Sequence, residues 1–274
     1  MPELPEVEFA RRCLARWTGG RRILRVEFDS RAGRIFRPAA PALVAKGLTG
    51  ARVKSVGRIG KHLLVRLEKG GASLGLLSHL GMTGKWLRSG AGLDPPSHSR
   101  ARLFLDDGKI LHYQDPRLFG RLRMVPGARF EEVREVAALG PDPLPGIDRS
   151  RLAAALSRTR LPIKVKLLDQ SLLPGVGNIH AAEACFRARI HPGRPSHELS
   201  LSEVGRLADG VLASFRSALE AEKGPGITYL EEGGANPFLV YGREGENCPR
   251  CRREEIRRIV QAGRSTFFCP RCQR

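Results

Sequence analysis

The first residues of the chain, Met1-Pro2-Glu3, put groups capable of covalent chemistry at one point. Removal of Met1 leaves the ring nitrogen of Pro2 as a secondary amine, with the carboxylate of Glu3 beside it. Because an α-amino group has a pKa near 8, about a tenth of it is unprotonated at pH 7, against less than about a thousandth of a lysine amine. Such an amine can attack an aldehyde-like carbon and form a cationic iminium adduct. On these residues alone, an ordinary N-terminus ahead of a helix is the alternative.

Four of the six cysteines form two Cys-x-x-Cys pairs near the C-terminus, and they are Cys248, Cys251, Cys269 and Cys272. Seventeen residues separate the pairs, a spacing typical of four thiolates that bind one zinc ion tetrahedrally. Two disulfides are the alternative, which the lack of a secretion signal disfavours. Four thiolates leave no open coordination position, so the predicted zinc is structural. Residues 248–274 also hold eight arginines, and Arg264 is expected near the tip of a hairpin.

A glycine-rich loop at 172–177 leads into a helix expected to begin near Asn178. Gly175 and Gly177 allow close approach of the backbone, and the free N–H groups at a helix start bind anions. A DNA phosphate is one expected occupant. A tight turn between two helices, with no ligand, explains this motif equally well.

The composition favours a polyanionic partner. The chain has 274 residues, with 47 Lys and Arg against 28 Asp and Glu, a net charge of +19 and a pI near 10.7. Such an excess favours nucleic acid, because neutralised phosphates release condensed counterions; an Arg-rich proteome is the alternative. A hydrophobic content of 41% excludes a largely disordered chain. No apolar run suits a signal peptide or a membrane span, so we expect a cytoplasmic protein, associated with the nucleoid of a bacterium.

The apolar patterns predict the elements that must position these groups. Val7, Ala10, Leu14 and Trp17 recur at helical spacing. Strands are expected over 22–28, 62–68 and 72–80, and a hairpin over 101–113 with its turn at Asp107-Gly108. Ser200 and Glu203 fit a capping box ahead of a further helix. Cys13 and Cys185 fall in helical patterns and are expected to be buried thiols.

These motifs, in their order along the whole chain, resemble the formamidopyrimidine-DNA glycosylase family. The resemblance rests on Pro-Glu-Leu-Pro-Glu-Val-Glu at the start, Gly-Val-Gly-Asn-Ile at 175–179 and the four-cysteine segment. Gly60-Lys61-His62, Ser78-His79-Leu80-Gly81-Met82, Asp115-Pro-Arg-Leu-Phe-Gly120 and Lys164 ahead of Leu167-Leu-Asp-Gln170 also match. It implies an α+β fold with an N-terminal β-sandwich and flanking helix (1–130), a linker (131–148), a helical helix-two-turn-helix domain (149–245) and a zinc finger hairpin (246–274).

The family likeness implies a bifunctional enzyme that excises oxidised purines from duplex DNA and then cleaves the strand. By analogy, Pro2 attacks C1′ of the damaged nucleotide, the base leaves and a Schiff base forms. Glu3 matches the position of the family's acid, which protonates the ring oxygen of the sugar as it opens. Successive β- and δ-elimination then release the two phosphates, with one structural Zn²⁺ and no redox cofactor.

The same resemblance implies which residues contact the DNA. Lys61 matches a lysine that contacts the phosphate beside the lesion, and Asn178 and Arg264 match two residues that pinch the backbone. Lys164 matches a lysine near the lesion. Met82, Arg117 and Phe119 fit the side chains that fill the space left by an extruded base. His79 is expected to contact a phosphate or to hold a structural hydrogen bond.

Two departures from the family pattern bear on specificity. His180 stands where the family commonly has Tyr, and the segment 227–241 is shorter than the usual capping loop over 8-oxoguanine. Formamidopyrimidines or further-oxidised guanines are therefore expected to be better substrates than 8-oxoguanine. The alternatives are an endonuclease VIII-like enzyme for oxidised pyrimidines and a non-catalytic zinc-finger DNA-binding protein. We expect a monomer.

Overall fold

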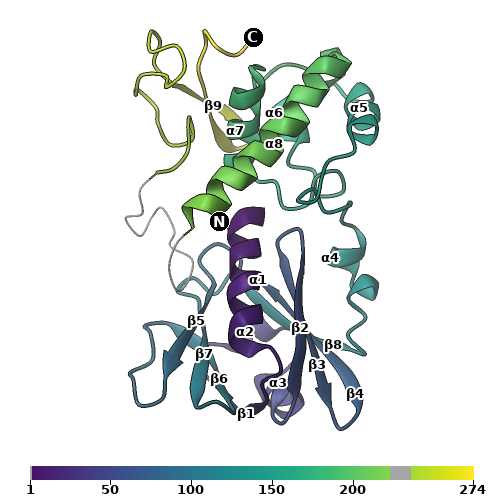
Figure 1. Cartoon of the computed structure of the whole chain (residues 1–274), viewed down its shortest axis with the longest axis vertical. Coiled ribbons are helices and arrows are strands. Elements are labelled where there is room, and N and C mark those ends of the chain that lie inside the picture. The colour runs from purple at the N-terminus through teal and green to yellow at the C-terminus, as the bar shows by residue number, and fades with distance from the viewer. Residues whose placement is uncertain (1, 223–235) are drawn as a thin grey trace. The chain divides into compact units, whose positions relative to one another are not determined.

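The computed structural model describes residues 2–222 and 236–274, which form two compact units (Figure 1). The first unit contains Pro2, residues 6–137 and residue 222 of the described chain. The second contains residues 3–5, 138–221 and 236–274. The three residues that follow Pro2 therefore belong with the second unit, although the rest of the N-terminal helix belongs with the first.

The first unit is built on two four-stranded antiparallel sheets. One sheet has the order β1-β6-β7-β5, and the other has the order β2-β3-β4-β8. Their strands are β1 (Ile23–Phe28), β2 (Arg52–Ile59), β3 (His62–Lys69), β4 (Ala72–His79), β5 (Lys85–Gly90), β6 (Ser99–Leu105), β7 (Lys109–Gln114) and β8 (Arg121–Pro126). The strands predicted over 22–28, 62–68 and 72–80 and the hairpin over 101–113 are confirmed as β1, β3, β4 and the β6–β7 pair.

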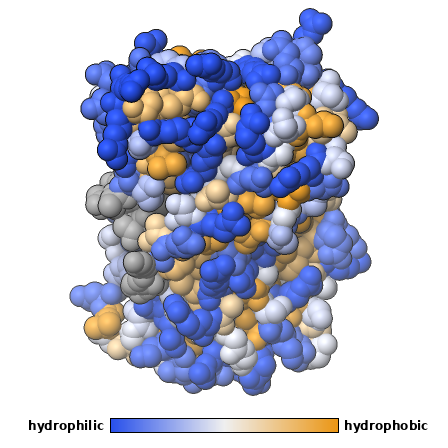
Figure 2. Space-filling view, turned by 45° about the horizontal axis from the view of Figure 1, so that its top comes forward, coloured by the Kyte–Doolittle hydropathy of each residue, from blue (hydrophilic) through white to orange (hydrophobic). Residues whose placement is uncertain are grey.

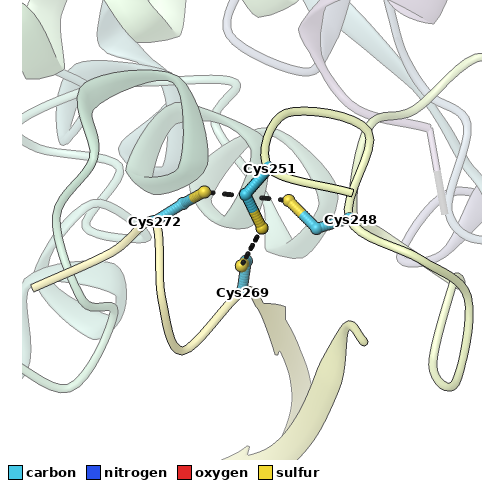
Figure 3. Close-up of side chains that lie close together, drawn as sticks. All are labelled: Cys248, Cys251, Cys269 and Cys272. Carbon is cyan, nitrogen blue, oxygen red and sulfur yellow. Dashed lines mark hydrogen bonds between the residues drawn. The ribbon is translucent and has the colours of Figure 1, made fainter. Parts of the chain in front are cut away.

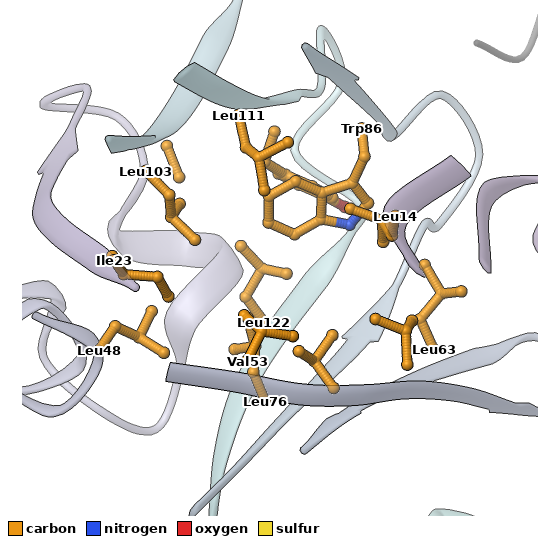
Figure 4. Packing of buried hydrophobic residues seen from close by; sticks show 14 of the residues in the cluster. Leu14, Ile23, Leu48, Val53, Leu63, Leu76, Trp86, Leu103, Leu111 and Leu122 are labelled. Carbon is orange, nitrogen blue, oxygen red and sulfur yellow. The ribbon is translucent and has the colours of Figure 1, made fainter. Parts of the chain in front are cut away.

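Side chains from both sheets share one core with the helix α1 (Leu4–Thr18). Figure 4 shows Leu14 of α1 close to Trp86 of β5, with Val53 and Leu122 of the other sheet in the same cluster. Burial of these apolar groups is the main force that holds the sheets together. The predicted apolar stripe of α1 is confirmed, since Val7, Ala10, Leu14 and Trp17 are all buried.

Short helices complete the first unit. They are α2 (Gly33–Phe36), α3 (Pro41–Leu48), the 3-10 turn η1 (Phe130–Glu132) and α4 (Arg134–Ala137). Phe130 and Val136 pack with Leu77 of β4 on the outer face of its sheet. The start of the expected 131–148 linker is thus part of this unit, and only residues 138–148 contain no helix or strand.

The second unit is helical, with a small hairpin. Its elements are α5 (Arg149–Ser157), α6 (Ile163–Lys166), α7 (Asn178–Ala188), η2 (Ser196–Glu198), α8 (Leu201–Ala221), β9 (Arg257–Gln261) and β10 (Arg264–Phe268). Apolar side chains of α5, α7 and α8 form its core, with Cys185 fully buried among them. Cys13 is buried in the core of the first unit, so both expected thiols are confirmed as buried.

The predicted capping box at the start of α8 is present and is reinforced by an arginine. Ser200 N donates to Glu203 Oε2 at 2.9 Å, and Glu203 N donates to Ser200 Oγ at 3.4 Å. Arg194 donates to both carboxylate oxygens. Chiefly because of the Arg194 bond, the pKa of Glu203 is lowered to about 2.

This carboxylate should give the fold a measurable acid dependence. A lowered pKa in the folded state stabilises the protein above the ordinary glutamate pKa, and the stabilisation is lost as the pH falls towards 2. We expect Glu203→Gln to lower the melting temperature at pH 6, and the difference from wild type to shrink between about pH 5 and pH 2. The control is Glu220→Gln, which changes an exposed residue of the same helix. A difference that stays constant down to pH 2 would contradict this role.

The face shown in Figure 2 is largely hydrophilic, with hydrophobic residues in scattered patches. Large exposed apolar side chains are well separated along the chain, for example Leu43, Leu161 and Leu201. No helix in 2–222 or 236–274 combines the length and apolar character that crossing a membrane requires.

Candidate active site and nucleic-acid interface

The carboxylate of Glu3 is bound at the N-terminus of α7. Its Oε2 accepts hydrogen bonds from Gly177 N at 2.8 Å and His180 N at 3.1 Å, and its Oε1 accepts one from Ile179 N at 2.8 Å. The next residue of the chain is also held by the glycine loop, since Leu4 N donates to Gly175 O at 3.0 Å. The residue that follows Pro2 therefore has one orientation, set by three backbone N–H groups.

This arrangement corrects one expectation. The N–H groups at the start of α7 do bind an anion, as predicted, but the anion is the protein's own Glu3 and not a DNA phosphate. Gly177 is required for this contact, because a Cβ there would lie 2.5 Å from Glu3 Oε1. The glycines of the loop thus serve the approach of the N-terminal segment. Pro2 itself is buried, directly ahead of Glu3.

Asn178 is held by two other elements of the second unit. Its Oδ1 accepts a hydrogen bond from Lys164 Nζ of α6, and its Nδ2 donates to Ser265 O of β10 at 2.8 Å. Lys164 is fully buried, and burial lowers the pKa of its amine to about 8. The lysine expected near the lesion is therefore enclosed by protein in this structure, with its amine directed at Asn178.

The resemblance implies that Asn178 contacts the DNA backbone, and on that basis loss of the buried amine should weaken DNA binding. Lys164→Met keeps the apolar stem but leaves Asn178 Oδ1 without this donor, at a cost of about 1 kcal/mol. We expect an affinity about fivefold weaker for a duplex with an abasic analogue, measured by equilibrium titration. Lys166→Met is the matched control, since Lys166 lies on the same helix and bonds Asp169 instead. Equal affinities for the two variants would show that Asn178 does not need Lys164.

The four cysteines converge on one point. Their sulfur atoms all lie within 4.8 Å of one another, and Figure 3 shows the side chains directed inwards from the two Cys-x-x-Cys turns. Within the described residues, no other group of three or more His, Cys, Asp or Glu side chains is placed to hold a metal ion. None of these sulfurs is in a disulfide. A tetrahedral thiolate site of this kind fits zinc, and the protein has one structural zinc.

The zinc site fixes the hairpin that presents Arg264. Arg264 is the first residue of β10, after a turn in which Ala262 and Gly263 have positive φ angles. It pairs with Gln261 across the hairpin and is exposed, as predicted for a residue near the tip. Arg250, between the first two cysteines, donates to Phe186 O of α7 at 2.8 Å. The finger is thereby attached to the helix that begins with Asn178.

Two loops of the first unit present the side chains expected to enter the duplex. Met82 is 36% exposed in one loop, and Phe119 is 38% exposed in the other, with the Arg117 guanidinium 4.8 Å from its ring centre. The buried carboxylate of Asp115 joins the loops. It accepts hydrogen bonds from Thr83 Oγ1 and Gly120 N, both at 2.8 Å.

His79 faces a cavity of about 390 Å³ at the end of β4. The cavity is also lined by Arg37, His62, Arg121 and Arg123. Burial, together with the nearby positive charges, lowers the pKa of His79 to about 4, so its imidazole is neutral at pH 7. Its Nδ1 accepts a hydrogen bond from Gly81 N at 3.1 Å. His79 therefore has the structural bond that was expected as one of its two roles.

Lys61 occupies the tip of the β2–β3 hairpin, in a turn that contains only Gly60 and Lys61.

The structure places the expected site residues in two groups, one in each unit. Pro2, Lys61, His79, Met82, Arg117 and Phe119 are in the first unit, and Glu3, Lys164, Asn178 and Arg264 are in the second. The consecutive residues Pro2 and Glu3 belong to different groups.

Sequence reasoning missed three buried carboxylates. Glu8 binds three arginines, Asp115 joins the two loops, and Glu183 of α7 accepts backbone N–H bonds from Leu239, Val240 and Tyr241. An acidic residue among apolar neighbours on a helix was the available signal for Glu183, and for Glu8 it was the pair of arginines three and four residues further along the helix. His180 is buried, and its Nδ1 bonds Ser214 Oγ at 2.6 Å. The shortened segment at 227–241 lies mostly outside the described residues, which resume at 236.

A protein with this fold and these groups belongs to the class of DNA-processing proteins with a zinc finger. Three family models match it in order: the formamidopyrimidine-DNA glycosylase N-terminal domain over 1–122, the H2TH domain of the same family over 139–229, and a zinc finger found in FPG and IleRS over 245–274. The chain belongs to the formamidopyrimidine-DNA glycosylase family.

Individual relatives match over their full lengths. The chain is 40% identical over 283 residues to the formamidopyrimidine-DNA glycosylase of Novosphingobium aromaticivorans, covering 100% of both chains. It is 40% identical over 289 residues to that of Thermus thermophilus, covering 100% of this chain and 98% of the relative. Similar solved structures include Lactococcus lactis Fpg in complex with DNA containing N7-benzyl-Fapy-dG, at a TM-score of 0.88, 31% identity and full coverage of both chains. The same Lactococcus lactis protein with DNA containing an abasic site matches at a TM-score of 0.87 and 31% identity over 99% of both chains.

Proposed function

We propose that this chain is a DNA glycosylase and abasic-site lyase that excises oxidised purines from duplex DNA, with formamidopyrimidines as the preferred substrates. Family membership supports the activity, and the arrangement around the first two residues of the mature chain supports the mechanism. The carboxylate of Glu3, held by three N–H groups, is the one observation on which the assignment of residues depends.

In this mechanism Pro2 is the nucleophile. Its nitrogen bonds to C1′ of the damaged nucleotide, and the bond between C1′ and the base breaks with its electron pair leaving on the base. The attacking nitrogen gives up its proton to the carboxylate of Glu3. The sugar ring then opens to an iminium ion as the bond between C1′ and the ring oxygen breaks, and Glu3 passes this proton to the ring oxygen. The fixed orientation of the Glu3 side chain favours proton transfer to one atom, since a positioned group needs no reorganisation at the moment of reaction.

The positive iminium nitrogen then makes elimination possible. It withdraws electrons and acidifies the C2′ proton, whose loss expels the 3′ phosphate; a second elimination expels the 5′ phosphate. No electrons are gained or lost overall, so these steps need no redox cofactor. The zinc shapes the finger and takes no part in bond making.

The remaining residues bind and distort the DNA. Lys61, His79, Asn178 and Arg264 contact the phosphate backbone. Met82, Arg117 and Phe119 occupy the space that an extruded nucleotide leaves in the stack. Lys164 supports Asn178. A net charge of +19 supplies the general attraction for a duplex. We infer from this activity that the protein works in the cytoplasm, on the nucleoid.

Borohydride trapping tests the proposal. The zinc-loaded protein, with removal of Met1 verified by mass spectrometry, is incubated with a duplex that carries an abasic site and is then reduced. A stable protein–DNA adduct is expected at Pro2; its absence would favour a DNA-binding module without catalysis. Competing duplexes with formamidopyrimidine, 8-oxoguanine or thymine glycol, opposite cytosine or adenine, then rank the lesions. Preferential cleavage at thymine glycol would reassign the chain to oxidised pyrimidines.

A further inference from the structure

A buried carboxylate that the proposed mechanism does not use lies on α1. The side chain of Glu8 is only 7% exposed and is surrounded by three arginines. Arg11 donates to both of its oxygens at 2.9 Å, and Arg12 Nε donates to Oε1 at 2.9 Å. Burial acts to raise the pKa of Glu8, but the hydrogen bonds from the arginines outweigh it, so the pKa lies below its ordinary value. Glu8 is therefore a charged anchor inside the first unit.

The third arginine differs from the other two in where it comes from. Arg11 and Arg12 follow Glu8 on the same helix, whereas Arg58 belongs to β2, 50 residues further along the chain. Arg58 Nε donates to Glu8 Oε2 at 3.2 Å, and the side chain is 4% exposed. Its Nη1 donates to Gly60 O at 3.1 Å. One buried guanidinium thus joins α1 to the backbone of the β2–β3 turn.

That turn presents Lys61. Ile59 pairs with His62, so only Gly60 and Lys61 lie between the strands. Gly60 has a φ of +52°, a conformation that glycine adopts readily in a two-residue turn. The carbonyl that Arg58 binds is the one joined to the nitrogen of Lys61. The hydrogen bond therefore acts on the peptide group that sets the direction of the lysine side chain.

We propose that Arg58, held in place by Glu8, is a positioning residue for Lys61. It fixes the Gly60-Lys61 turn relative to α1, the helix that follows Pro2. The inference rests on the proposed function, because it assigns Lys61 to a phosphate beside the lesion. A phosphate contact depends on where the ammonium group lies, so a turn released from α1 would lose much of that contact while the rest of the fold stays intact. Arg58 itself is too buried to touch DNA.

Salt dependence of DNA binding separates this role from a purely structural one. Each neutralised phosphate contributes about 0.9 to the slope of log K against log salt concentration. The ligand is a duplex with a tetrahydrofuran abasic analogue, which binds without being cleaved, so the result does not depend on the chemistry. We expect Arg58→Met and Lys61→Met to lower the slope by the same amount, about 0.9, and to weaken binding by about tenfold at low salt.

The double variant and one matched control decide the outcome. If Arg58 acts through Lys61, the slope of Arg58→Met/Lys61→Met equals that of Lys61→Met alone. Arg12→Met removes a donor to the same carboxylate but from an exposed side chain of α1, and its slope should match wild type. Melting curves verify folding; should Arg58→Met not fold, Arg58→Lys takes its place, since one ammonium group cannot make both of the bonds.

Three results would overturn the inference: a wild-type slope for Arg58→Met, a further fall in the double variant, or an unchanged slope for Lys61→Met. Failure of the proposed function has a different signature. In that case wild-type protein binds the analogue but yields no adduct with borohydride at a natural abasic site.

Discussion

A Pro2→Gly variant should form the borohydride-trapped adduct at least about a hundredfold more slowly than wild type, because the reacting amine loses its ring and its placement. Glycine still offers a primary amine after removal of Met1, but it lacks the pyrrolidine ring and forms an imine that must gain a proton to become cationic. The nitrogen would no longer be held in one position ahead of Glu3. The measurement is the rate of adduct formation under single-turnover conditions.

The affinity of this variant for DNA provides the control. Binding rests on many phosphate contacts, so we expect the dissociation constant for an abasic analogue to stay within about tenfold of the wild-type value. Mass spectrometry must show that Met1 is absent from both proteins. A wild-type rate in Pro2→Gly, or an adduct that maps to an internal lysine, would remove the basis of the proposed mechanism.

Removal of the zinc should have the second largest effect. The apolar cluster around the cysteines is small and includes Ile256 and Phe267 of the finger together with Phe186 of α7. A segment of that size depends on its metal for folding. Without zinc, the hairpin that carries Arg264 and the Ser265 carbonyl that binds Asn178 both lose their positions. We expect DNA affinity to fall by roughly a hundredfold, about 2.7 kcal/mol for two lost contacts.

Chelation of the zinc and a cysteine variant both test the predicted loss of DNA affinity. Zinc release is followed with a colorimetric chelator, and affinity is measured before release and after zinc is restored. Cys272→Ser should reproduce the loss, while the melting transition of the first unit remains. Unchanged affinity in the metal-free protein would mean that the finger does not contact DNA.

The elements that the sequence predicted are those with regular periodicity. β3 alternates buried and open positions, and α1 has a clear apolar stripe. The strand β2 escaped notice because a register shift between Val53 and Ser55 breaks its alternation. β5 and β8 are short, and exposed or half-exposed charged residues such as Lys85, Arg88 and Arg121 interrupt their apolar residues.

The candidate site, too, could be predicted from the sequence only in part. Motifs identified which residues matter, but contacts between distant segments set what each one does. Nothing local to the glycine loop indicates that Glu3 occupies the start of α7. The short helix α6 likewise gives no sign that Lys164 is enclosed. Such contacts depend on the tertiary fold, which composition and spacing do not specify.

The carboxylate of Asp115 has a consequence for how the protein searches DNA. It ties Thr83 and Gly120 to one point, and the backbone of Gly81 runs so close to Phe119 that no side chain fits between them. The loops that carry Met82 and Phe119 are therefore joined, and the two side chains should move together. We expect both side chains to press against a base pair at the same time. A weakened pair then opens in one cooperative step, whereas an intact pair stays closed.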